Sequence, residues 1–463
     1  MNALESHAIV IGGGFAGLTV ARVLADHFTH VTVIERDFFD DEKHGHKGVP
    51  QAHHAHGLTN KGARALEGLF PGLRAELALA GSPVFDHGEG VSTWLPCGPI
   101  PTSTSGIDIQ AFTRHLLDSC LRRRTLEISG VNICDGLEVT GLQMDATGRQ
   151  VVGVLQRGRA RFPAISHEQT SIMRADFVVD ASGRFSAMPA WLGELGFPSV
   201  QENVVDPKIT YSSCTFIGPP KTWRALYQWA DPPDSPRGAY ALYTESHEWL
   251  ITLYGAAGDM PPTREAGYRA FSASLRNPVL DQLLEESTMT SAIHRYVRTE
   301  NRWRAFHRMP VWPDGLVVLG DAFCAFNPKY GQGLTLAVLE AIKLGELFSQ
   351  HGIATARPGL AKKFQKHLSA LVVWPWRLTT GEDLLWEAKM RGEKGPLLAR
   401  SFHWYKALLY HAVAKDAKLY GVFLSVFHMM RMPAYLFRPF VILRIATVCL
   451  LASPFFKRRS TKS

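Results

Sequence analysis

The stretch Ala8-Ile9-Val10-Ile11-Gly12-Gly13-Gly14-Phe15-Ala16-Gly17 decides the fold of the N-terminal part of the chain. It matches G-x-G-x-x-G, with an apolar strand-like run before the glycines and a helix-like run from Leu18 to His27 after them. In such a turn Gly12 permits the tight bend, Gly14 lets the backbone approach a pyrophosphate, and Gly17 lets the helix pack closely on the strand. The N-terminus of the helix, with its free N–H groups, would then face the phosphates.

A second apolar run, Val31 to Ile34, ends in Glu35, eighteen residues after Gly17. A carboxylate at this point can accept hydrogen bonds from a ribose 2′-OH and would repel the 2′-phosphate of NADP. Strand, turn, helix, strand and acid together predict a βαβ unit that binds FAD or NAD. The alternatives are a glycine-rich turn without a ligand and a plain surface acid.

A second motif lies about three hundred residues further along the chain. Gly315 to Leu319 is an apolar strand, Gly320-Asp321-Ala322 closes it, and Asn327-Pro328-Lys329-Tyr330-Gly331-Gln332-Gly333 leads into a predicted helix from Leu334 to Phe348. The acid can hold the ribityl hydroxyls, and the N–H groups that open the helix can face the pyrimidine edge of a flavin. The motif therefore favours FAD over NAD, against the alternative of an ordinary strand-to-helix connection.

The two motifs, with Asp180-Ala181-Ser182-Gly183-Arg184 between them, resemble the FAD-dependent monooxygenases of the p-hydroxybenzoate hydroxylase-like superfamily. Within it, the stretch from Lys47 to Leu58 (KGVPQAHHAHGL) and the stretch from Val317 to Gly333 resemble the bacterial polyether epoxidases of the lasalocid type, and more distantly squalene epoxidase. The resemblance covers about residues 7 to 350 and leaves the tail uncovered.

The resemblance implies an α/β fold in three parts: a Rossmann-like FAD-binding domain, an inserted antiparallel-sheet substrate domain and a helical C-terminal region. We expect the FAD-binding domain at 1–80, 108–200 and 306–350. A substrate-side segment is expected at 81–107 and the substrate sheet at 201–305, with the helical region at 351–463. Residues 108 to 124 are predicted to be one helix that carries Arg114.

The resemblance also implies roles for individual residues. Gly12, Gly14, Gly17 and Glu35 would bind the ADP half of FAD, Arg114 would contact the ribose or pyrophosphate side, and Asp321 would hold the ribityl chain. Pro328, Gly331, Gln332 and Gly333 would lie beside the isoalloxazine ring. The full set of expected cofactor-binding residues is Gly12, Gly14, Phe15, Ala16, Gly17, Glu35, Arg36, Arg114, Asp180, Asp321, Pro328, Gly331, Gln332 and Gly333. Two alternatives stay open: Arg114 as a solvated helix charge, and Asp180 as a structural residue.

The expected activity is insertion of one oxygen atom of O2, through a flavin hydroperoxide, into a lipophilic olefin of terpenoid or polyketide type. Epoxidation is favoured because Ala322 is followed by Phe323, Cys324, Ala325 and Phe326, where many hydroxylases have Ala-Ala-His. An alkene can attack the electrophilic oxygen without a protein base, and no catalytic residue is assigned. The alternatives are hydroxylation of an aromatic or quinone-like ring, flavin-dependent reduction of prenyl double bonds, and a carrier or structural flavin.

The resemblance implies NADH or NADPH as the electron donor, bound transiently, because this family often binds the nicotinamide without a second dinucleotide fingerprint and none is present here. A separate flavin reductase is the alternative. The Trp94-Leu95-Pro96 and Trp374-Pro375-Trp376 stretches do not match the W-x-W-x-I-P motif of flavin halogenases.

Aromatic side chains mark the predicted substrate sheet, and strand alternation requires half of them to face away from any pocket. They are Tyr211, Phe216, Tyr240, Tyr243, Trp249 and Tyr254.

The overall charge, +8 with pI about 9.1, comes without a basic stripe in a recognised module, so we expect no nucleic-acid partner. The six cysteines form no C-x-x-C pair and the first residues lack a secretory pattern, which favours a cytoplasmic protein. No carboxylate stands at ligand spacing from His53, His54 and His56, so no metal is expected.

The tail from Leu419 onward is apolar, but its longest charge-free runs have 12 residues, too few to span a bilayer. One interpretation is a set of helices lying in the membrane interface, with Lys457-Arg458-Arg459 at anionic headgroups of the cytoplasmic face. The alternative is a helical cap on the flavin domain.

Overall fold

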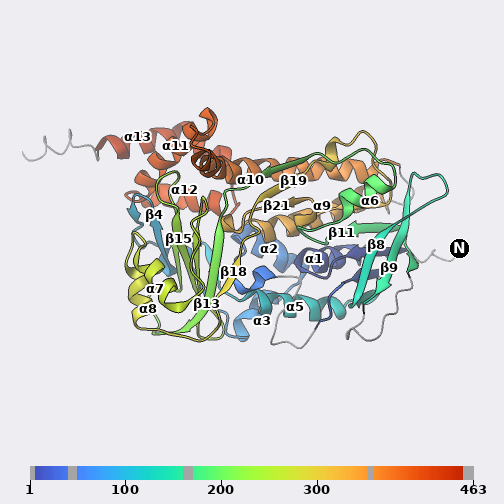
Figure 1. Cartoon of the computed structure of the whole chain (residues 1–463), viewed down its shortest axis with the longest axis horizontal. Coiled ribbons are helices and arrows are strands. Elements are labelled where there is room, and N and C mark those ends of the chain that lie inside the picture. Colours follow the sequence, from blue (N-terminus) through green and yellow to red (C-terminus); the bar gives the residue numbers. More distant parts are fainter. Residues whose placement is uncertain (1–5, 40–49, 160–169, 353–357, 452–463) are drawn as a thin grey trace, which may run out of the picture.

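The structure is a computed structural model that describes residues 6–39, 50–159, 170–352 and 358–451. A parallel sheet lies toward the N-terminal end in Figure 1, and a largely antiparallel sheet lies at the opposite end. Lys47 to Val49 and Lys457 to Arg459, which the sequence analysis singled out, lie outside the described residues.

The parallel sheet has the order β20-β11-β1-β2-β7. Its strands are β1 His7–Ile11, β2 His30–Ile34, β7 Val131–Cys134, β11 Phe177–Asp180 and β20 Leu316–Val318. Most of their apolar side chains are buried, as expected of parallel strands covered by other layers. The register pairs Ile11 with Asp180 and Asp180 with Val318, so the carboxyl ends of three strands meet at one edge. This edge brings the two sequence motifs together.

Helices and a small sheet cover the parallel strands. The helices α1 Phe15–Leu24 and α9 Gly333–His351 pack against each other, and α2 Asn60–Leu69 contacts both. The remaining elements of this layer are α3 Leu73–Leu79, α5 Arg114–Leu126 and α6 Met188–Glu194. An antiparallel sheet of β8 Leu137–Met144, β9 Val151–Gly158 and β10 Ser171–Arg174 contacts β2 and β11.

The helix predicted over residues 108 to 124 begins later than expected. Residues Asp108–Gln110 form strand β6, which pairs with β3 Val84–Asp86, and α5 starts at Arg114. Thr113 sets this start, because its side chain accepts a hydrogen bond from Leu116 N–H as an N-cap. The apolar spacing had concealed this boundary.

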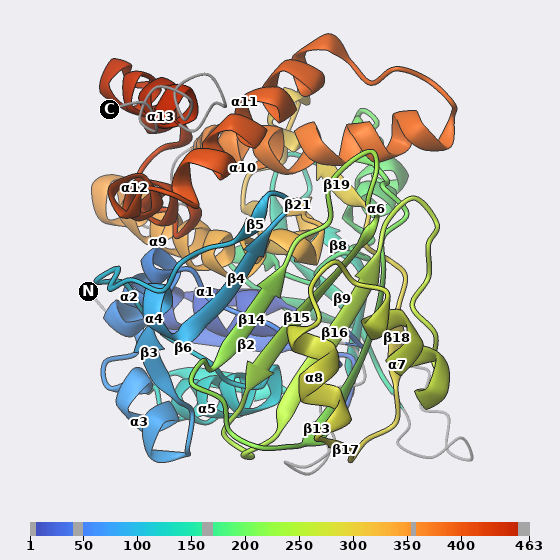
Figure 2. The ribbon, with the colours of Figure 1, turned by 90° about the vertical axis from the view of Figure 1, so that its left-hand side faces the viewer.

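The second sheet has the order β17-β13-β16-β15-β14-β4-β5, and β18 also pairs with β13. Its strands are β4 Val91–Leu95, β5 Gly98–Pro99, β13 Thr210–Ile217, β14 Ala225–Gln228, β15 Arg237–Tyr243, β16 Trp249–Gly255, β17 Thr288–Met289 and β18 His294–Tyr296. Helices α7 Glu265–Ala273 and α8 Val279–Glu285 cover its outer face, toward the viewer in Figure 2.

The aromatic residues of this sheet divide evenly between its faces, as strand alternation requires. Phe216, Tyr243 and Trp249 pack with the cluster under α7 and α8. Tyr211, Tyr240 and Tyr254 lie on the opposite face, where Tyr211 and Tyr254 are buried.

Short elements complete the fold. They are α4 His87–Gly90, the sheet of β12 Glu202–Val205, β19 Asn301–Arg304 and β21 Cys324–Ala325, and the 3₁₀ turns η1 Pro50–His53, η2 Phe306–Arg308, η3 Gly320–Ala322 and η4 Pro328–Tyr330. The predicted fold class is confirmed, while the expected domain boundaries stay a prediction.

The C-terminal region consists of α10 Leu360–Met390, α11 Leu397–Val413, α12 Ala417–Phe427, the turn η6 Pro433–Phe437 and α13 Pro439–Leu451. From α11 onward it forms a core with Leu95 of β4 and Ile107 at the edge of the second sheet, and His428 after α12 is hydrogen-bonded to Asn60 of α2. None of the described helices is long and apolar enough to cross a membrane.

Candidate cofactor site

A cavity of about 340 Å³ opens at the edge where the strands β1, β11 and β20 end. Twelve of the fourteen expected residues line it: Gly12, Gly14, Phe15, Ala16, Glu35, Arg36, Arg114, Asp321, Pro328, Gly331, Gln332 and Gly333. Gly17 and Asp180 do not line it. The fold therefore gathers residues from positions 12 to 333 around one cleft.

The glycines of the first turn have three different surroundings. Gly12 has φ +103°, and a Cβ there would lie 2.7 Å from the carbonyl oxygen of Ala181. A Cβ on Gly17 would lie 1.8 Å from the carbonyl oxygen of Gly12, so Gly17 serves the packing of α1 on β1. A Cβ on Gly14 would meet nothing within 4 Å, because Gly14 faces the cleft.

Glu35 is buried, and its carboxylate organises the turn beside it. One oxygen accepts a 2.8 Å hydrogen bond from Gly13 N–H, and the other accepts a 2.9 Å bond from Asp37 N–H. A carboxylate is an acceptor that can also bind the hydroxyl groups of a ligand.

Arg114 is 6% exposed, which excludes the solvated helix charge. Its Nε donates a 2.7 Å hydrogen bond to Asp118, and its guanidinium lies 5.4 Å from the ring centroid of Phe15. Arg114 therefore presents a fixed cation in the wall of the cleft.

Asp180 is fully buried, and its contacts are those of a structural residue. Its carboxylate accepts hydrogen bonds from the backbone N–H and hydroxyl of Ser182 and from the hydroxyl of Ser186. It thereby fixes the turn that follows β11. Burial raises its pKa, and these hydrogen bonds oppose the rise.

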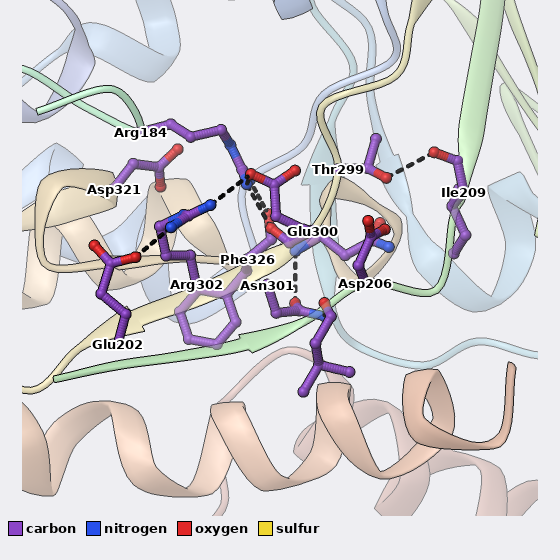
Figure 3. A network of polar contacts seen from close by, with 12 residues as sticks. Arg184, Glu202, Asp206, Ile209, Thr299, Glu300, Asn301, Arg302, Asp321 and Phe326 are labelled. Atoms are coloured by element: carbon purple, nitrogen blue, oxygen red, sulfur yellow. Dashed lines mark hydrogen bonds and ion pairs between the residues drawn. The ribbon is translucent and has the colours of Figure 1, made fainter. Parts of the chain in front are cut away.

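Two arginines that the site prediction left out hold the loops around the second motif. Arg184 donates a 2.8 Å hydrogen bond to the carbonyl of Phe326 and pairs with Glu300, beside Asp321 (Figure 3). Arg304 donates to the carbonyls of Ala322 and Arg184, both at 2.8 Å. Nothing local in the sequence marks these long-range contacts.

Asp321 lies in η3, directly after strand β20 and Leu319, and lines the cleft. Burial raises its pKa, while Arg184, Arg114 and Arg304 lower it. Behind it, Glu340 of α9 accepts a 2.5 Å hydrogen bond from Gly320 N–H, and burial raises the pKa of Glu340 to about 8. Glu340 is therefore protonated at neutral pH, a feature that the sequence did not reveal.

Asn327 to Gly333 form the other wall of the cleft. Gly331 has φ +62°, and no side chain of the described residues caps the N-terminus of α9. Within the described structure, two buried polar atoms of this wall have no hydrogen-bond partner: Nδ2 of Asn327 and Oε1 of Gln332.

These observations fit a dinucleotide with a flavin. The uncapped N-termini of α1 and α9 meet at one cleft, where they can stabilise negative charge. The space at Gly14 and the unpartnered atoms of Asn327 and Gln332 are suited to a polar ligand that approaches the backbone closely.

Of the histidine group, His53 and His54 pack against the second sheet, while His56 lines the cleft. The ring of His53 stacks on His294 at 3.8 Å, and Nδ1 of His54 lies 2.6 Å from the hydroxyl of Ser213. Burial lowers the pKa of His54 and of His56 to about 3. Among the described residues, no group of three His, Cys, Asp or Glu side chains could hold a metal ion.

The fold and this cleft define a flavin-dependent monooxygenase with FAD as its cofactor. The chain belongs to the family described as FAD binding domain, which matches residues 5–373. NAD(P)H is the reductant typical of this family.

Curated relatives agree with this assignment. The chain is 32% identical over 343 residues to Protein Rv3254 of Mycobacterium tuberculosis, covering 73% of this chain and 72% of that protein. It is 24% identical to kynurenine 3-monooxygenase of Salinispora tropica, covering 76% and 74%. It is 22% identical to squalene epoxidase 2, mitochondrial, of Arabidopsis thaliana, covering 73% of this chain and 53% of that enzyme.

Among solved structures, p-nitrophenol 4-monooxygenase PnpA from Pseudomonas putida DLL-E4 matches with a TM-score of 0.64 at 17% identity, covering 92% of this chain and 98% of that one. The predicted superfamily is thus confirmed. The closer likeness to epoxidases stays a prediction.

Proposed function

We propose that Gly14 and the N-terminus of α1 bind the pyrophosphate of FAD, that Glu35 binds the ribose, and that Phe15, Ala16, Arg36 and Arg114 complete this end. Asp321 would hold the ribityl chain. Pro328, Gly331, Gln332 and Gly333 would contact the isoalloxazine ring. The support is that all of these residues line one cleft. Gly17 and Asp180 would shape the cleft from behind, because neither lines it.

We further propose that the enzyme epoxidises a lipophilic olefin of terpenoid or polyketide type. Bound FAD, once reduced, supplies the electrons that activate O2; one oxygen atom enters the substrate and the other leaves as water. NADH or NADPH would reduce the flavin after transient binding.

One observation carries this choice: two histidines and two tyrosines near the flavin turn are held in their neutral forms. The low pKa values of His54 and His56 make both histidines very weak bases, and burial raises the pKa of Tyr211 and Tyr254. Hydroxylation of a phenol benefits from a base that accepts the phenol proton, whereas an alkene has no proton to lose. These four side chains are therefore poor bases, which suits an olefin better than a phenol.

The test supplies purified enzyme with FAD, NADH or NADPH, and ¹⁸O2, and offers squalene and p-nitrophenol in separate reactions. We expect the olefin to be converted to an epoxide that carries one ¹⁸O atom from O2. A hydroxylated phenol without any epoxide would favour the aromatic alternative. Reduced, unlabelled olefin would instead identify a reductase. If activity requires an added flavin reductase, NAD(P)H is not the direct electron donor of this enzyme.

We also propose peripheral contact with an anionic membrane through α13. This helix buries Val441 and Ile445 and exposes a stripe of apolar side chains: Phe440, Leu443, Leu450 and Leu451. Residues 391 to 463 contain 13 of the 50 basic residues but only 2 of the 42 acidic ones. An apolar stripe within a basic segment suits the surface of an anionic bilayer.

Sedimentation with phosphatidylcholine vesicles, with and without phosphatidylglycerol, tests this contact. Leu443→Ser should lower binding to the anionic vesicles roughly 10-fold, because burying a leucine side chain contributes about 1.5–3 kcal/mol. Leu79→Ser is the matched control, since Leu79 of α3 is also exposed. The proposed contact is refuted if the wild-type protein does not sediment with anionic vesicles at low salt.

A further inference from the structure

The helix α10 extends past residue 373, where the family match ends, and its last turns reach the turn that forms the flavin side of the cleft. Its first half packs on the core of the parallel sheet through Phe364 and Leu368, and Trp386 packs with Tyr211 and Tyr254 of the second sheet. The residues between these two contacts include the acidic pair Glu382-Asp383. Both side chains are buried.

We infer that Glu382 and Asp383 are positioning residues of the flavin site, which hold the turn from Asn327 to Gly331 in place from the C-terminal helical region. The inference rests on the proposed placement of the isoalloxazine ring beside Pro328, Gly331, Gln332 and Gly333. It makes α10 part of the cofactor site.

The first hold is ionic. Lys329, at the centre of the turn, points away from solvent, and its ammonium pairs with Glu382; Lys406 of α11 pairs with the other oxygen of the same carboxylate. Although burial alone would raise it, the two lysines lower the pKa of Glu382 to about 2. The pair is thus charged at neutral pH, and a buried charge keeps its partner close, because separation would leave it unpaired.

The second hold is a chain of hydrogen bonds that ends on the turn. Asp383 accepts a 3.1 Å bond from the hydroxyl of Tyr330 and a 2.6 Å bond from Nδ2 of Asn301. Oδ1 of Asn301 in turn accepts a 2.8 Å bond from the backbone N–H of Asn327. Asp383 therefore fixes the turn at both Asn327 and Tyr330.

Asn327 and Tyr330 flank Pro328 and Lys329, and Gly331 follows directly, so a shift of the turn moves the residues that line the cleft. The sheet side holds the same turn, since the hydroxyl of Tyr240 donates a 3.0 Å bond to the carbonyl of Lys329. The turn is clamped between α10 and the second sheet, and only the α10 side depends on residues beyond the family match.

The experiment compares Asp383→Asn with Glu393→Gln, a matched carboxyl-to-amide control just after the end of α10, where Glu393 is exposed and pairs with Arg391. An asparagine cannot accept from both Tyr330 and Asn301 without turning its NH2 group toward one of these donors. FAD and ADP are titrated separately into full-length apo-protein, with flavin fluorescence and calorimetry as readouts, and the visible spectrum of bound flavin is recorded.

We expect Asp383→Asn to weaken FAD binding roughly 10-fold or more and to shift the flavin spectrum, because one of the two hydrogen bonds that Asp383 accepts is lost. ADP binding should stay unchanged, since the Gly14 and Glu35 end is untouched. Tyr330→Phe, which removes one hydroxyl only, should show a smaller loss of FAD affinity. This variant tests the inference if Asp383→Asn does not fold. Unchanged FAD binding in a folded variant, or equal losses for FAD and ADP, overturns the inference. Neither result bears on epoxidation, which the ¹⁸O2 experiment tests separately.

Discussion

Tyr211, on the inner face of the second sheet, donates a 2.7 Å hydrogen bond from its hydroxyl to Oδ1 of Asn327 in the turn beside the cleft. The same oxygen accepts a 3.1 Å bond from Lys329 N–H, so both acceptor positions of the amide are used. The orientation of the Asn327 amide is thereby fixed, and its Nδ2 is left without a partner among the described residues. The sheet thus sets which atom the turn presents to a ligand.

Tyr211→Phe should leave the side-chain amide of Asn327 free to rotate, because the hydrogen bond from the Tyr211 hydroxyl is lost. We expect the free energy of unfolding to fall by about 1 kcal/mol, as for the loss of one buried hydrogen bond. More of the NAD(P)H consumed should end as hydrogen peroxide, because the cleft then closes less tightly on the flavin. Product formed per NAD(P)H oxidised measures the effect.

Tyr243→Phe is the control for this substitution, because Tyr243 lies on the opposite face of the same sheet, against the cluster under α7 and α8. If the two variants lose coupling to the same extent, the Tyr211 hydroxyl has no special part in presenting Asn327.

Gly14→Ala and Gly17→Ala should separate cofactor binding from folding. A methyl group on Gly14 enters open space in the cleft, so the variant should fold with an unchanged Tm but bind FAD at least about 10-fold more weakly. A methyl group on Gly17 would lie 1.8 Å from a carbonyl oxygen, so this variant should be expressed poorly or unfold at lower temperature. Thermal unfolding of the apo-proteins, followed by FAD titration, gives both quantities. Gly14→Ala protein that binds FAD normally would refute the placement of the pyrophosphate.

The parts of the site that were predictable from the sequence are those built from neighbours in the chain. Gly12 to Gly17, Glu35 and the turn from Asn327 to Gly333 each depend on one local conformation, which leaves a local pattern. Arg304, Glu340 and Asp383 act through partners elsewhere in the fold, so no short motif marks them. The start of α5 was missed for the reverse reason, since strand β6 ends at Gln110 and Thr113 caps a helix within one apolar pattern.

Glu340→Gln should stabilise the protein at alkaline pH. The pKa of Glu340 is raised by burial to about 8, so the folded protein keeps this proton over a range in which the unfolded chain, with an ordinary pKa near 4.5, has lost it. The resulting stabilisation is present below pH 4.5, declines as the pH rises, and is gone above about pH 8. A glutamine stays neutral and can still accept from Gly320 N–H. We therefore expect a higher Tm than wild type at pH 9 and a small difference at pH 5; the reverse order would mean that Glu340 is ionised in the folded protein.

The pair His428 and His87 should make the attachment of the C-terminal region sensitive to acid. Nδ1 of His428 accepts a 3.1 Å hydrogen bond from Asn60 N–H, so its Nε2 carries the proton and donates to Nδ1 of His87 at 3.0 Å. Burial lowers the pKa of His428 to about 4 and that of His87 well below its ordinary value. Both rings are neutral in the folded protein.

The unfolded chain takes up protons at these histidines near pH 6.5, whereas the folded chain does not, so stability falls as the pH drops from 6.5 toward 4. Each histidine contributes up to about 1.4 kcal/mol per pH unit in this window. In His428→Gln the amide oxygen can accept from Asn60 and the NH2 group can donate to His87, so the variant should match wild type at pH 7.5 and lose less stability at pH 5. Urea unfolding at both pH values measures the difference.

His27→Gln is the control variant, because His27 lies just after α1, is less buried and also has a lowered pKa. If His428→Gln is as acid-sensitive as wild type, the ring of His428 is already protonated in the folded protein, and the acid step comes from other histidines with a lowered pKa, such as His54 and His56.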